Sequence, residues 1–222
     1  MGRTSNNKTI RNKFTINILI MNIICNDCVG GELYKLYNEK YQNPFIWTIL
    51  PFKDFLNLYK NYENINFNNV EYNETPNYMF PWYMSSLIID GKVNLYFPHH
   101  ARYEEYNELV KLQVGNTQNV YAWSHIDEYL IEHYKRRVLR MVEEPVFVYS
   151  EENRNTEEQI KELLEEAKTS KKKLILITSN EKYEKEYNKY DNIKFIYKTQ
   201  NEVVQKTQAE WIKNKLDFFI KS

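Results

Sequence analysis

The chain has 222 residues, of which 42% are hydrophobic and 27% charged, so it can bury one sizeable core and is too apolar for wholesale disorder. Thirty basic residues balance thirty acidic ones, and this zero net charge argues against nucleic acid as the main partner, because binding to phosphates needs excess basic side chains. Two cysteines are too few for a disulfide framework, which favours a reducing, cytoplasmic location.

The N-terminus combines a polar stretch with an apolar run. We expect residues 1–12 to be a flexible tail and residues 13–222 to form a single domain. The run from Phe14 to Cys25 follows basic residues, as in a secretory signal, but Asn17 and Asn22 interrupt it and it is too short to cross a membrane. It therefore predicts a buried first strand and no transmembrane segment.

The next hundred residues predict short helices and a hairpin. A short helix is expected over residues 32–38, after two glycines, and a second over residues 51–62, where apolar side chains recur at helical spacing behind a proline. Residues 61–81 are rich in asparagine and predict a long loop. Asp90 and Gly91 separate two short apolar runs and predict a tight antiparallel hairpin.

Helices and strands alternate in the C-terminal half. One helix is expected from about Ser124 or Asp127 to Val142, and Thr156 and Gln159 have the spacing of a capping box at the start of another. Strands are predicted over residues 146–149, 173–178 and 193–197, with a helix after each. This alternation predicts an α/β fold with a mostly parallel sheet flanked by helices and an inserted antiparallel hairpin.

The turn after the first strand is the leading candidate site, because ligands of parallel sheets bind at the carboxyl ends of the strands. Cys28 is expected at the start of a helix, where unpaired N–H groups and the positive end of the helix dipole favour a thiolate. The competing interpretation is that Cys28 is a small buried side chain beside a glycine turn.

The residues around Cys28 supply further polar groups. Gly30 and Gly31 can adopt backbone conformations closed to other residues, in which their N–H groups converge on an anion or an oxyanion. Asn26 and Asp27 add side-chain donors and acceptors. Cys25 and Cys28 together also form a CxxC pair, which admits a redox site or, with His99 and His100, a zinc site.

A nucleophilic thiol needs a base, usually a histidine. His99 and His100 follow the second hairpin strand, whose end could reach the turn, and His125 near a helix start is the alternative. Arg136 and Arg140 share a helical face and predict a site for a phosphate, diphosphate or carboxylate, although a solvated helix face is the competing interpretation.

One family resemblance rests on the stretch from Asn22 to Tyr37, on the later Asn-Pro-Phe at residues 43–45, and on Pro51 followed by Asp54 and Phe55. These residues resemble a bacterial family of unknown function linked to exopolysaccharide biosynthesis, in which the strand ends in Ser-Asn-Asn-Cys-Trp-Gly-Gly. The resemblance covers residues 14–60.

The remaining chain resembles that family more weakly. The part containing His99 is also similar to papain-like cysteine peptidases related to the family, which favours His99 as the base. Cys25 stands where the family has serine, so Cys28 is the shared cysteine and the CxxC interpretations lose weight. Asp27 replaces an asparagine and Val29 a tryptophan, which puts the contacts of those side chains in question.

The resemblance implies a role in surface-polysaccharide biosynthesis, and a short similarity to capsule-biosynthesis enzymes implies coenzyme A as an acyl donor. The first hypothesis is an acyltransferase or hydrolase with Cys28 as nucleophile, His99 as base and Asp27 beside the sulfur. The second is a non-catalytic protein that binds a nucleotide or glycan at the same turn. Both predict a small-molecule or glycan partner and no metal, and a peptidase would need a substrate groove that the sequence does not indicate.

Overall fold

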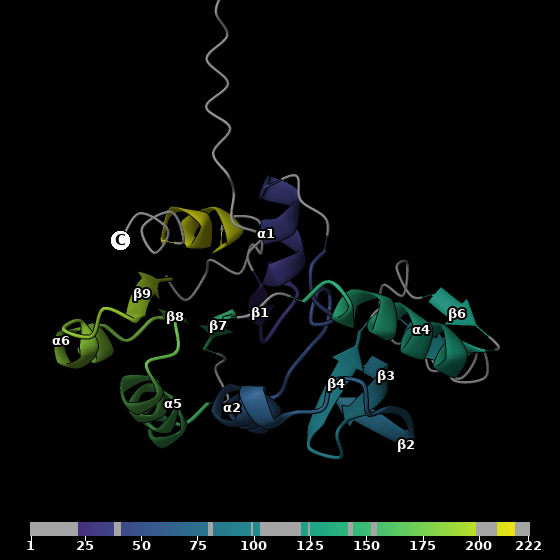
Figure 1. Ribbon diagram of the computed structural model, residues 1–222. Helices are drawn as coiled ribbons and strands as arrows, with labels where there is room; N and C mark the ends of the chain where they lie inside the picture. Colours follow the sequence, from purple (N-terminus) through teal and green to yellow (C-terminus); the bar gives the residue numbers. More distant parts are fainter. Residues whose placement is uncertain are drawn as a thin grey trace, which may run out of the picture.

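The fold is taken from a computed structural model of the chain (Figure 1). It describes residues 22–37, 41–79, 82–98, 100–102, 121–123, 125–141, 144–151, 155–198 and 208–215, with backbone alone for residues 74–79, 82–84, 100–102 and 121–123. The predicted tail, residues 1–12, and most of the predicted first strand lie outside these ranges.

A parallel four-stranded sheet forms the centre of the fold, in the order β1 (Ile23–Cys25), β7 (Val146–Ser150), β8 (Leu174–Thr178) and β9 (Ile193–Tyr197). Nearly all its residues are buried, because helices cover both faces and the strands read as continuous apolar runs. The expected α/β fold with a mainly parallel sheet is confirmed.

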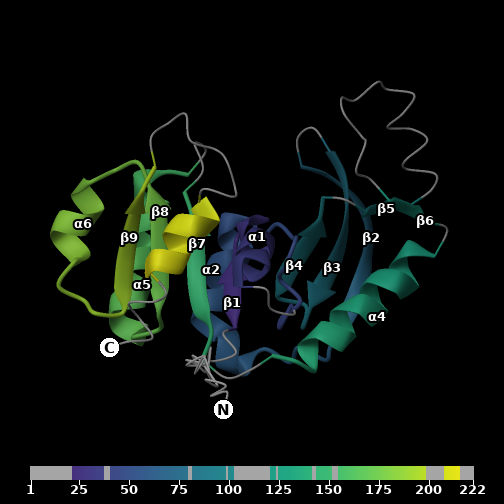
Figure 2. The ribbon, with the colours of Figure 1, turned by 90° about the horizontal axis from the view of Figure 1, so that it is seen from above.

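Each face of this sheet has its own helices (Figures 1 and 2). On one face, α1 (Val29–Tyr37) and a helix at residues 208–215 pack against alternate strand residues such as Ile175 and Ile177. On the other, α2 (Phe52–Asn61), α5 (Glu157–Ser170) and α6 (Lys182–Tyr187) share a larger apolar core with Phe147. The capping box of Thr156 and Gln159 is present at the start of α5.

A separate antiparallel sheet of β2 (Val70–Met79), β3 (Trp82–Ile89) and β4 (Val93–Phe97) is inserted between β1 and β7 (Figure 2). The hairpin turn at Asp90 and Gly91 has φ of 53° and 63°, both left-handed, and the Lys92 N–H donates across it to the Ile89 carbonyl at 2.9 Å. The prediction of a long loop over residues 61–81 was wrong. A 3-10 turn, Tyr62–Asn64, precedes β2, whose pairing with β3 outweighs the low strand propensity of asparagine.

Helix α4 (Ile126–Val138) packs beside this sheet, near a two-stranded parallel pair of β5 (His100–Arg102) and β6 (Tyr121–Trp123). The α1–α2 loop joins the two sheets: Ile49 and Tyr96 exchange N–H···O bonds of 2.9 and 3.1 Å, and the Leu50 N–H donates to the Asn26 carbonyl. Within the described ranges, no helix has both the length and the apolar character needed to cross a membrane.

Candidate functional site

The turn between β1 and α1 lies at the carboxyl edge of the parallel sheet, as the sequence predicts. Asp27 begins the helix, because its Oδ1 accepts a hydrogen bond of 2.9 Å from the Val29 N–H. The Gly31 N–H donates to the Cys28 carbonyl at 3.0 Å. Cys28 therefore stands at the first turn of α1, and its side chain is 6% exposed, whereas Cys25 is 1% exposed within the core.

The electrostatics of Cys28 differ from the prediction. Burial and, next, the nearby carboxylate of Asp27 together raise its pKa to about 12. Burial, followed by Asp27 and Cys28, raises the pKa of Cys25 well above its usual value. The expected stabilisation of a thiolate by the helix terminus was wrong for this conformation, because desolvation and a neighbouring negative charge both favour the neutral thiol.

The two glycines serve close packing. Neither has a positive φ, so the unusual backbone conformation expected for them is absent. A Cβ on Gly30 would lie 3.2 Å from the Cys25 Sγ, and one on Gly31 would lie 2.2 Å from the indole of Trp47. Glycine is needed here so that α1 can approach both β1 and the Trp47 side chain.

Asn26 holds two strands together at this edge. Its Oδ1 accepts a hydrogen bond of 2.7 Å from the Ser150 N–H, and its Nδ2 donates one of 3.1 Å to the Ser150 carbonyl. The side chain therefore extends the pairing of β1 and β7 by one rung. The sequence predicted that Asn26 offers a donor and an acceptor to a ligand at this turn, but both ends of its amide are engaged with Ser150.

The histidine partner of Cys28 stays a prediction. His99 lies outside the described residues, and the backbone alone is described for His100. His125 is exposed at the start of α4 and makes no capping bond with its side chain. In the part of the chain that the structure describes, no three His, Cys, Asp or Glu side chains gather as metal ligands would.

The two arginines predicted to bind an anion are exposed. Arg136 lies 3.7 Å from Glu132 one turn earlier on α4, and Arg140 follows the helix. Arg137, which the sequence did not single out, points inward instead and is 6% exposed. It contacts the Nε2 of His133 at 3.4 Å.

The sequence also missed a group of polar residues at the other strand ends. Ser150 and Thr178 end β7 and β8, and Glu151 and Lys198 directly follow β7 and β9. The Thr178 hydroxyl donates to the Glu151 carboxylate. Lys198 donates to the Ser150 hydroxyl at 3.4 Å and to the Glu151 carbonyl. Their position after predicted strands was a usable signal, because carboxyl ends of parallel strands meet at one edge.

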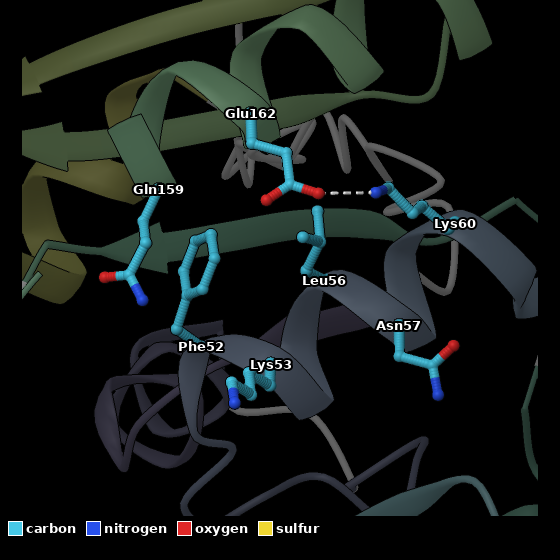
Figure 3. A pocket seen from close by; sticks show the side chains of 7 residues that line it. All are labelled: Phe52, Lys53, Leu56, Asn57, Lys60, Gln159 and Glu162. Atoms are coloured by element: carbon cyan, nitrogen blue, oxygen red, sulfur yellow. Dashed lines mark hydrogen bonds and ion pairs between the residues drawn. The ribbon is translucent and has the colours of Figure 1, made fainter. Parts of the chain in front are cut away.

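A shallow groove of about 350 Å³ lies elsewhere, between α2 and α5 (Figure 3). Phe52 and Leu56 contribute apolar walls, and an ion pair of 2.7 Å joins Lys60 to Glu162 at its side. Both helices lie on the face of the sheet opposite α1, so this groove is separate from the Cys28 turn. Its lining contains no cysteine or histidine.

Comparison with known proteins gives one family. Residues 2–114 match the family described as a domain of unknown function, DUF1919. That segment includes residues 14–60, which carry the resemblance seen in the sequence. No curated protein matches the chain. Because the matched segment is more than half of the 222 residues, the chain belongs to the DUF1919 family.

Proposed function

We propose that the protein binds a sugar-containing or nucleotide-like small molecule at the carboxyl edge of the parallel sheet and acts in surface-polysaccharide biosynthesis. The observation that carries this proposal is the gathering of polar residues from all four strand ends at one edge. The role in polysaccharide biosynthesis rests on the sequence resemblance of residues 14–60. The cytoplasm is the compartment that fits best, because both cysteines are free and buried.

The chemistry of this edge suits a ligand that carries both hydroxyl groups and a phosphate. Glu151 and Asp27 offer carboxylates that accept hydrogen bonds from sugar hydroxyls, and Ser150 offers a hydroxyl. Lys198 is a half-buried ammonium group that would neutralise a phosphate. Ligands of parallel α/β sheets bind at such edges through a few polar groups at strand ends.

A thermal-shift screen tests binding at this edge. Nucleoside diphosphates and nucleotide sugars should raise the melting temperature of the protein, because a ligand that binds only the folded state stabilises it. Lys198→Gln should reduce that shift, whereas Lys185→Gln, an exposed lysine on α6, should leave it unchanged. Equal shifts in the two variants would contradict the proposed site.

A second candidate is an acyltransferase or hydrolase in which Cys28 is the nucleophile, His99 the base and coenzyme A the acyl donor. Its support is the position of Cys28 at the first turn of α1 on the same edge. With a pKa of about 12, however, only about one Cys28 in 10⁵ is a thiolate at pH 7. This candidate therefore requires a base that deprotonates Cys28 once the substrate is bound.

Alkylation separates the two candidates. Iodoacetamide at pH 7, read by peptide mass spectrometry, should label Cys28 more slowly in the folded protein than in urea-unfolded protein. Faster labelling in the folded protein, together with loss of acyl-coenzyme A turnover in Cys28→Ser, would favour the enzyme. Binding that survives Cys28→Ser without turnover would favour the binding protein.

A further inference from the structure

Arg137 is a buried cation in a position unrelated to the carboxyl edge. It lies in the last turn of α4 and donates a hydrogen bond of 2.9 Å from Nη1 to the Ile46 carbonyl. Its guanidinium stacks 5.2 Å from the ring centre of Tyr41. Figure 1 shows the α1–α2 loop, which carries Tyr41 and Ile46, running between α1 and this end of α4.

The charge of Arg137 has no carboxylate partner among the described residues. Its contacts there are a backbone carbonyl, an aromatic ring and the His133 Nε2 at 3.4 Å. A buried charge without a counter-ion is unfavourable, so a ligand that brings a negative charge to Arg137 would be stabilised there. Burial and, next, the positive charge of Arg140 lower the pKa of Arg137 to about 10.

The surroundings of Arg137 also have the composition of a binding site. Tyr41 and His133 are half-buried and Arg140 is exposed, so residues around the buried Arg137 reach solvent. Trp47, beside them in the same loop, has a left-handed φ of 61°, and its Nε1 donates 3.0 Å to the Tyr41 hydroxyl. A non-glycine residue in that conformation is strained and is held there by its packing.

We propose that Arg137, with His133 and Arg140 beside it, binds an anionic oxygen group of a ligand at the junction of α4 and the α1–α2 loop. The group is a phosphate or a carboxylate, since a guanidinium forms two parallel hydrogen bonds with either. An anion bound there would supply a negative charge, which the described residues do not place beside the guanidinium. This site is additional to the carboxyl edge proposed above.

Thermal shifts with simple anions test the site. Phosphate, diphosphate and glucuronate are compared with sodium chloride at equal ionic strength, so that the phosphate and carboxylate sources are distinguished. At about 100 times its Kd, the preferred anion should raise the melting temperature by about 5 °C or more. No shift beyond that of chloride with any of the three would overturn the proposal.

The variants provide a matched control. Arg137→Gln should abolish the shift in melting temperature. Arg136→Gln removes the same charge from the preceding position, which faces solvent, and should retain the shift. Equal loss in both would show unspecific charge effects and contradict the site.

A second substitution covers the case in which Arg137→Gln does not fold, which circular dichroism will reveal. Arg137→Lys keeps the charge but lacks the planar fork, and should bind about 10-fold more weakly. Unchanged affinity in Arg137→Lys would also contradict the proposal. Lys198→Gln should leave the shift caused by the anion unchanged. A negative result at the Arg137 site can therefore be distinguished from a negative result at the carboxyl edge.

Discussion

Gly31 shows how a single missing Cβ determines the position of a helix. The Gly31→Ala substitution would place a methyl group against the Trp47 indole, at 2.2 Å from its nearest atom. We expect it to lower the free energy of unfolding by about 1–3 kcal/mol, measured by urea denaturation, because overpacking displaces the neighbour or the backbone.

A double substitution isolates the cause of this effect. With Trp47→Ala already present, Gly31→Ala should stabilise the protein by about 0.5–1 kcal/mol, because alanine is the better helix former and the indole no longer opposes it. If Gly31→Ala were equally destabilising in both backgrounds, contact with Trp47 would not be the reason for the glycine.

A second prediction at the residue scale concerns Asn26. Asn26→Ala removes both hydrogen bonds to Ser150 and leaves a buried backbone N–H and carbonyl without this partner. We expect a loss of about 2–4 kcal/mol in the free energy of unfolding, since each unsatisfied buried group costs about 1–3 kcal/mol. Asn188→Ala, an exposed position after α6, should change it by less than about 0.5 kcal/mol.

The pKa of Cys28 predicts how stability depends on pH. Its folded pKa of about 12 exceeds that of an unfolded thiol, near 9, so the folded protein holds the proton more tightly. This stabilisation is fully present below pH 9 and is lost as the pH rises towards 12. When the pH rises from 8 to 10, the free energy of unfolding of the wild type should fall by about 1–2 kcal/mol more than that of Cys28→Ser, as measured by urea titration. Parallel curves would mean that the thiol is accessible to water.

At the scale of elements, α5 has the most complete set of local signals. The Thr156 hydroxyl accepts from the Gln159 N–H, and the Gln159 side chain accepts from the Thr156 N–H. Thr156→Ala should lower the free energy of unfolding by about 1 kcal/mol, because it leaves a helix N–H without a partner. Thr169→Ala, near the other end of α5, should cost less than about 0.5 kcal/mol; an equal loss would rule out capping as the cause.

The elements that the sequence predicted are those with strong local patterns. The capping box at Thr156, the left-handed turn at Asp90 and Gly91, and the apolar runs of β7, β8 and β9 are all present. Strand β2 was missed because its stability comes from hydrogen bonds to β3, and its own asparagines favour turns.

In the candidate site too, features set by neighbours in sequence could be predicted, and features set by distant residues could not. The position of Cys28 between a strand and a helix follows from its neighbours in sequence. Its pKa depends on burial by residues far along the chain, which no local pattern reveals. The inward direction of Arg137 likewise depends on the Ile46 carbonyl, 91 positions away.

At the scale of the whole molecule, the segment that matches the family ends before the parallel sheet is complete. The match ends at residue 114, but β7, the strand that pairs with β1, begins at Val146. We expect residues 1–114 alone to lack a cooperative unfolding transition in circular dichroism, because β1 and its apolar neighbours then have no sheet to join. A cooperative transition in that fragment would show that the antiparallel sheet suffices.

The pairing of Asn26 with Ser150, 124 positions apart, also bears on how the protein folds as it is made. At about 5–20 residues per second, a ribosome needs roughly 6–25 s to synthesise that interval. During this time the apolar β1 leaves the ribosome, while its partner strand has not yet been synthesised. Production of the native protein in cells should therefore depend on chaperones that shield an unpaired strand from aggregation.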